Sequence, residues 1–189
     1  MSIRCICLLP LLGCQTKADP PAVDPTVMVE VRDGTKLVAS VRPGRPCRAS
    51  IGPLEMIIGG PPLISQLGAT QWTGKDGANG ITLAREGDPV ARIFPIDDRS
   101  TVGVFDLNGV AMLRAQATPA GATVSDAASR PLRMLAMTGS TIKTDHPELV
   151  VTGTHDVLLA SVLTAPELAP EIRMLAACER VLVTEKKEL

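Results

Sequence analysis

The sequence predicts a mainly β domain: an antiparallel hairpin meander that forms a barrel or a sandwich, with one or two C-terminal α-helices. Two observations carry this prediction. Between residues 27 and 153, short β-prone runs alternate with turn residues. After residue 153, apolar residues recur at steps of three and four, as in an amphipathic helix. The length of 189 residues fits one domain, which we assign to residues 27–189.

The first strands are expected over residues 27–31 and 37–41. Asp33-Gly34 lies between them, and this dipeptide is a strong hairpin signal between two β-prone runs. Residues 54–58 form another apolar run, which is either a core strand or an exposed edge that accepts a partner strand. These elements start the meander.

A weak internal repeat covers the middle of the chain. Each copy has a β-prone run, a polar turn and a second run that carries an arginine, and successive copies begin 21 and 20 residues apart. Such spacing indicates stacked supersecondary units, here β-hairpins. An isolated hairpin cannot bury its apolar face, so several must close on each other. The copies are residues 83–93, 104–114 and 124–134, with a degenerate copy at 29–41.

The C-terminal helices are expected within residues 155–183. Thr154 is the predicted N-cap of a helix over residues 156–163, and Pro170 suits the first position of a second helix. The second helix is expected to bury one apolar stripe, with Glu171, Arg173, Glu179 and Arg180 largely off it. The stripe consists of Leu168, Ile172, Leu175, Cys178 and Leu182.

This pattern of hairpins followed by an apolar helix, over residues 80–183, resembles the tubby and phospholipid-scramblase β-barrels. In those barrels a helix runs through a closed meander, so the resemblance implies a helix inside the barrel. It transfers no functional residue to this chain. We favour a plain β-barrel or sandwich with packed helices.

The N-terminus has the parts of a secretory signal peptide, assigned to residues 1–13. Arg4 supplies the positive charge, and residues 6–12 form an apolar run too short to span a bilayer. The segment Leu11-Leu12-Gly13-Cys14 resembles the bacterial lipobox. That resemblance implies cleavage after Gly13 and attachment of diacylglycerol to the Cys14 thiol. The alternative is a buried N-terminal element with an incidental cysteine.

Residues 14–26 follow as the lipidated cysteine and a tether. Pro20, Pro21 and Pro25 favour an extended, semi-rigid spacer that holds the domain away from the membrane. The lipobox resemblance also gives Gln15 a meaning, because a residue other than Asp after the cysteine favours the outer membrane. We therefore expect a lipid-anchored protein of the bacterial cell envelope, at the outer membrane and facing the periplasm or the cell surface.

The five cysteines divide into three groups. Cys5 and Cys7 leave with the signal peptide, and Cys14 carries the lipid. Cys47 and Cys178 remain, and in an oxidising periplasm they are candidates for a disulfide. The alternative is that both are separate, small buried side chains.

Composition argues against several partners and cofactors. The net charge is −1, no basic run is present and aromatic residues are only 2%, so we expect no nucleic-acid partner. Five residues separate Gly68 from Gly74, and Asp76 follows Lys75, so this segment departs from a phosphate-binding loop. We expect no cofactor and no metal.

Candidate site residues are few. His146 and His155 are the only histidines, and no serine lies in a nucleophile-elbow motif, so no catalytic residue is assigned. Asp97-Asp98 resembles a carboxylate pair but is better explained as an exposed turn. Trp72 is either a binding anchor or a packed side chain.

These observations favour a non-catalytic envelope protein with a binding, assembly or structural role. Its expected partners are the membrane, through the anchor, and another envelope protein. One alternative is an envelope hydrolase with a site around His146 and His155. Another is a carrier of an apolar ligand, which would need an apolar cavity that the helices leave empty. The sequence identifies no small-molecule ligand.

Overall fold

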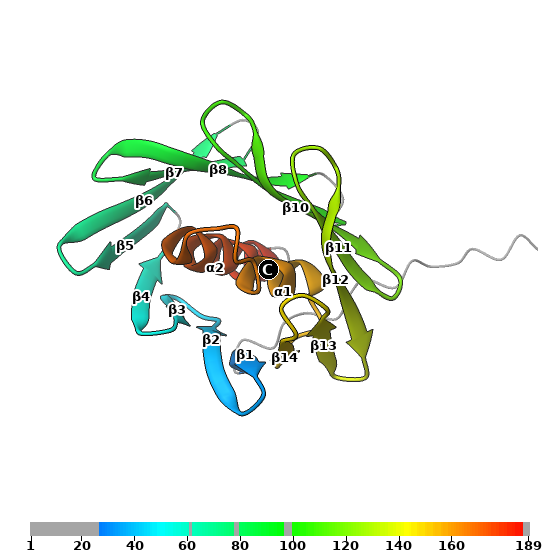
Figure 1. Cartoon of the computed structure of the whole chain (residues 1–189). Coiled ribbons are helices and arrows are strands. Elements are labelled where there is room, and N and C mark those ends of the chain that lie inside the picture. The colour runs from blue at the N-terminus through cyan, green and yellow to red at the C-terminus, as the bar shows by residue number, and fades with distance from the viewer. Residues whose placement is uncertain (1–26, 61, 78–79, 97–99, 187–189) are drawn as a thin grey trace, which may run out of the picture.

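The computed structural model describes residues 27–60, 62–77, 80–96 and 100–186. In these ranges the chain forms fourteen antiparallel strands in a closed barrel, followed by two helices (Figure 1). The strands are β1 (Val29–Asp33), β2 (Lys36–Arg42), β3 (Cys47–Ile51), β4 (Leu54–Gly59), β5 (Leu63–Leu67), β6 (Thr70–Gly77), β7 (Gly80–Arg85), β8 (Asp88–Ile96), β9 (Thr101–Phe105), β10 (Ala111–Thr118), β11 (Gly121–Ser125), β12 (Pro131–Thr138), β13 (Thr141–Thr144) and β14 (Val150–Thr152). The helices are α1 (Val157–Leu163) and α2 (Pro170–Lys186).

Each strand pairs with its neighbours in sequence, and β1 closes the ring by pairing with β14. Val31 lies opposite Val151 in that last pair, so the two ends of the meander meet through buried side chains. The predicted fold class, a mainly β meander with C-terminal helices, is confirmed. Of the two predicted architectures the structure is the barrel. Strand β4 pairs with both β3 and β5, so it is not an exposed edge.

The strands bury alternate residues, as a barrel with one apolar face requires. In β3, Cys47, Ala49 and Ile51 are buried, whereas Arg48 is exposed and Ser50 is half-buried. Inward strand residues and helix residues belong to one continuous core. Because aromatic residues make up only 2% of the chain, the core consists mainly of aliphatic side chains.

The internal repeat corresponds to hairpins. The copies match β7–β8, β9–β10 and β11–β12, and the last two share one turn geometry. In these two turns the carboxylate of Asp106 or Asp126 accepts hydrogen bonds from the backbone N–H groups two and four residues later. Gly109 and Ser129 occupy the same left-handed position, with φ of 81° and 62°. The repeat is therefore a repeat of turn chemistry as well as of strands.

Both helices lie inside the ring of strands (Figure 1). Helix α1 packs against β10, β11 and β12, and α2 packs against β2, β3 and β4. All seven residues of α1 are buried. The predicted apolar stripe is buried as expected, at Leu168, Ile172, Leu175, Cys178 and Leu182, and burial extends beyond it to Met174, Ala176 and Ala177. Because the barrel wall surrounds α2, burial is not limited to one stripe, and the charged residues Glu171, Arg173, Glu179 and Arg180 are half-buried.

The prediction that Thr154 is the N-cap of α1 is wrong. Asp156 caps α1, and its Oδ1 accepts hydrogen bonds from the N–H groups of Leu158 and Leu159. The Thr154 hydroxyl instead accepts a hydrogen bond from the N–H of Asp156, two residues later in the chain. Within the described residues, neither helix has the length and apolarity that a bilayer crossing demands.

Several predictions fall outside the described residues. Residues 1–26 hold the signal peptide, the lipobox with Cys14, and the tether. Asp97 and Asp98 also lie outside the described ranges. These features therefore stay predictions from the sequence.

Candidate functional site

The structure places Trp72 with the barrel core. Its side chain belongs to the buried cluster and is 5% exposed. It lies opposite Ser65 on β5 and opposite Arg85 on β7. Trp72 is therefore not part of the outer surface, and as a binding anchor it would serve only a ligand inside the barrel.

The two histidines occupy exposed positions. His146 lies in the loop between β13 and β14, and His155 lies just before α1. The Asp156 carboxylate caps α1 and also forms an ion pair with Arg180, with 2.8 Å between the Arg180 Nε and Asp156 Oδ2. Asp156 is thus committed to two helices, which leaves it poorly placed to orient His155 as a catalytic base.

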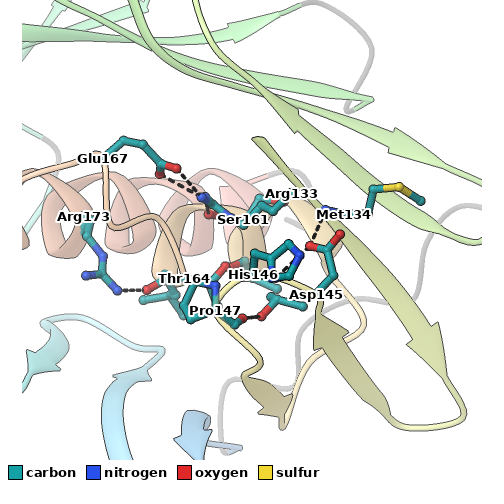
Figure 2. Close-up of polar contacts among 12 residues, drawn as sticks. Arg133, Met134, Asp145, His146, Pro147, Ser161, Thr164, Glu167 and Arg173 are labelled. Atoms are coloured by element: carbon teal, nitrogen blue, oxygen red, sulfur yellow. Dashed lines mark hydrogen bonds and ion pairs between the residues drawn. The ribbon is translucent and has the colours of Figure 1, made fainter. Parts of the chain in front are cut away.

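The carboxylate of Asp145 is likewise occupied by hydrogen bonds from the backbone. It accepts hydrogen bonds from the N–H groups of Met134 and His146, as Figure 2 shows. Over residues 27–60, 62–77, 80–96 and 100–186, no three His, Cys, Asp or Glu side chains are grouped closely enough to hold a metal ion. The histidines therefore sit in turns and loop ends that the surrounding carboxylates stabilise.

A disulfide joins Cys47 to Cys178. The first residue is on β3 in the wall and the second on α2 in the interior, with 5.9 Å between their Cα atoms. Both side chains are fully buried. The bond therefore fixes α2 to the wall from inside the barrel.

A charged cluster lies at the end of α1, where the chain turns into α2 (Figure 2). Arg133 comes from β12, and its side chain is only 1% exposed. Its Nη1 donates to both carboxylate oxygens of Glu167, at 2.7 and 2.8 Å, and its Nη2 donates to the carbonyl of Ser161 at 3.2 Å. The wall strand thereby holds the loop between the two helices.

Arg173 on α2 joins the same cluster. One of its guanidinium nitrogens donates to the carbonyl of Leu163. Burial, and next the charge of Arg133, lower the pKa of Arg173 to about 10, while Glu167 acts in the opposite direction. Arg173 therefore remains a cation at neutral pH. Ser161 and Leu163 belong to the last turn of α1, so both arginines neutralise the negative end of that helix.

This cluster supports structure rather than chemistry. Two guanidinium groups that are cationic at neutral pH and one carboxylate already paired with them offer no proton acceptor for a substrate. Sequence reasoning missed the inward position of Arg133. The alternation along β12 could have indicated it. Arg133 lies two residues from buried Leu135 and so faces the same side of the strand, whereas Leu132 and Met134 are exposed.

A hollow of about 260 Å³ lies on the outside of the barrel. Residues of strands β2, β3 and β4 line it, together with Met28 just before β1, and we call it the β2–β4 hollow. Its lining is Met28, Ser40, Arg42, Arg48, Ala49, Ser50 and Glu55. Arg42 lies directly opposite Arg48 across the β2–β3 pair, and Ser40 lies directly opposite Ser50. The two serine hydroxyls are hydrogen-bonded at 2.8 Å.

The charge of this hollow is positive. Arg42 and Arg48 are exposed, and neither forms an ion pair with any residue that the structure describes. One carboxylate, that of Glu55, lines the hollow. Glu30 on neighbouring β1 is already paired with Arg32, at 2.8 Å between Oε2 and Nη2. Sequence reasoning missed this site because it ended the second strand at Val41 and assigned no strand to residues 47–51.

No family model, no curated protein and no solved structure matches this chain. The likeness to the tubby and scramblase barrels stays a resemblance of sequence pattern.

Proposed function

We propose that this chain is a lipid-anchored protein of the bacterial envelope with a non-catalytic binding, assembly or structural role. In this role the outer wall of the barrel contacts the partner. The observation that carries the proposal is the occupation of the barrel interior by α1 and α2 (Figure 1). The interior is a packed core, so a partner meets the protein from outside.

Three features keep the helices in place. The residues of α1 are all buried, so expelling it would expose a fully apolar helix. The Cys47–Cys178 disulfide ties α2 to β3. Arg133 ties the loop between the helices to β12 through Glu167. Room for an apolar ligand inside the barrel would require all three to give way, which favours the binding role over the carrier role.

The anchor rests on the lipobox and on the proline-rich tether. The disulfide agrees with this location, because structural disulfides form and persist in oxidising compartments such as the periplasm. The envelope partner is expected to be a protein or a membrane component within reach of a tethered barrel.

Metabolic labelling tests the anchor. The full chain is expressed in a bacterium supplied with an alkyne-tagged fatty acid, beside a Cys14→Ser variant. We expect the tag on the parent chain, an intact mass without residues 1–13, and no tag on the variant. An untagged parent chain that keeps its N-terminal methionine in the cytosol would contradict the proposal.

Crosslinking in intact cells tests the binding role. Neighbours that crosslink to the parent chain should be envelope components, and they should be lost when exposed side chains of the outer wall are changed. Hydrolysis of envelope material that depends on His146 or His155 would instead establish the hydrolase alternative.

A further inference from the structure

We propose that the β2–β4 hollow binds a phosphate group, held by the guanidinium groups of Arg42 and Arg48 and by the hydroxyls of Ser40 and Ser50. This inference rests on the proposed binding role of the outer wall and names the ligand chemistry. It does not depend on the lipid at Cys14, because the hollow belongs to the barrel itself.

The first argument is the placement of two like charges. Directly opposite residues of an antiparallel pair have Cβ atoms about 5 Å apart, and like charges there destabilise the sheet. Arg42 and Arg48 occupy such a pair. Neither forms an ion pair with a described carboxylate: Glu30 is engaged by Arg32, and Glu55, which lines the hollow, is not bonded to either arginine. An anion between the two guanidinium groups would relieve the repulsion and gain charge-assisted hydrogen bonds.

The second argument is the number of donors. Each guanidinium carries five N–H donors in a fixed fork, and each serine adds a hydroxyl. A carboxylate has two oxygens and satisfies one fork. A phosphate monoester has three terminal oxygens and a charge near −2 at neutral pH, so it matches two forks on neighbouring strands. The rigid β2–β3 pairing holds these donors on one face without ordering a loop.

The shape of the β2–β4 hollow and its other lining residues also suit a phosphorylated ligand. The hollow of about 260 Å³ accommodates a small charged group at a curved wall. Met28 gives it an apolar side beside Arg42, which suits the organic part of a phosphorylated ligand. Glu55 lies opposite Ser50 on β4 and opposes an anion. Its removal should therefore strengthen binding, which gives the proposal a signature that a merely structural hollow lacks.

The experiment measures phosphate binding to the full chain by calorimetry at low ionic strength, with inorganic phosphate as the probe. Arg42→Gln and Arg48→Gln should each weaken binding about tenfold, as expected for loss of a charged hydrogen-bonding partner. Glu55→Gln should tighten binding several-fold. Arg92→Gln is the matched control, because Arg92 is an exposed strand arginine on β8, outside the hollow.

A second arm separates two sources of phosphate. Flotation with phosphatidylcholine vesicles, with and without phosphatidic acid, tests a lipid headgroup. Binding that requires phosphatidic acid and Arg42 assigns the site to a lipid phosphate, whereas binding of inorganic phosphate alone assigns it to a soluble phosphorylated ligand. Absence of binding to both probes, or equal weakening by Arg92→Gln and Arg42→Gln, would overturn the proposal. This outcome is independent of the labelling at Cys14, so the two proposals fail separately.

Discussion

Arg133, Glu167 and Arg173 show how one carboxylate balances a buried cation and a half-buried one. Glu167 accepts both hydrogen bonds from Arg133 Nη1 and opposes the loss of charge on Arg173. Removing one partner of such a pair leaves an uncompensated charge away from water, which is more costly than losing the pair as a whole. The stability of the helix-to-helix loop should therefore depend on Glu167.

Glu167→Gln should lower the free energy of unfolding by about 1–3 kcal/mol, a range reduced from that of fully buried pairs because Glu167 is partly exposed. Urea unfolding followed by circular dichroism measures this change. Glu148→Gln is the control, since Glu148 is exposed and should stay within about 0.5 kcal/mol. Equal stability of Glu167→Gln and Glu148→Gln would refute the role of the cluster.

Ser129 holds a left-handed conformation that favours glycine, whereas its equivalent in the preceding hairpin is Gly109. Ser129→Gly should stabilise the protein by about 0.5–1 kcal/mol, because the strain of a side chain at φ of 62° disappears. Gly109→Ala should destabilise it by a similar amount. The two melting curves should move in opposite directions, and a shared direction would disprove the equivalence of the two turns.

Asp126 gives a pH dependence of definite sign. Backbone hydrogen bonding from Arg130, followed by the Arg130 side chain, lowers the pKa of Asp126 below its ordinary value of 3.8. A carboxylate with a depressed folded-state pKa contributes stability that is present above 3.8 and is lost as the pH falls through the lower value. Acid unfolding of Asp126→Asn should show a smaller loss over that window than the parent chain, and identical slopes would contradict this assignment.

At the scale of elements, sequence pattern predicted the β1–β2 hairpin and the repeated hairpins, because alternation and turn chemistry are local signals. It did not predict β3 as a strand, since Pro43, Pro46 and Gly44 interrupt the apolar pattern around it. It also placed the cap of α1 at Thr154 instead of Asp156. Capping depends on where the backbone leaves its extended conformation, and tertiary packing decides that point here.

The disulfide links two elements of different kinds, a wall strand and an interior helix, across 131 residues of sequence. Closing so long a loop restricts the unfolded chain strongly. Replacing both cysteines with alanine should lower the free energy of unfolding by about 3–5 kcal/mol. Urea unfolding with and without reductant measures the effect, and the double variant should be insensitive to reductant. Two free thiols in periplasmic material would contradict the bond.

At the scale of the whole molecule, composition and periodicity predicted a mainly β domain with terminal helices. They did not decide between barrel and sandwich, because closure depends on the pairing of β1 with β14, two strands at opposite ends of the meander. They predicted the buried stripe on α2 but not the burial of Met174, Ala176 and Ala177, since a sequence pattern does not tell a helix against a wall from a helix inside a ring. The β2–β4 hollow was missed because its arginines meet only through strand register.

The proposed binding role of the outer wall requires a barrel whose interior is filled by α1 and α2. Native-state hydrogen exchange on the full chain tests this most directly, because amides inside a packed core exchange only through large-scale unfolding. We predict that the amides of α1 exchange as slowly as those of strands β10 and β11, which pack around it. Exchange of α1 that is much faster than exchange of these strands would mean that the helix leaves the barrel, and the interior would then be open to a ligand.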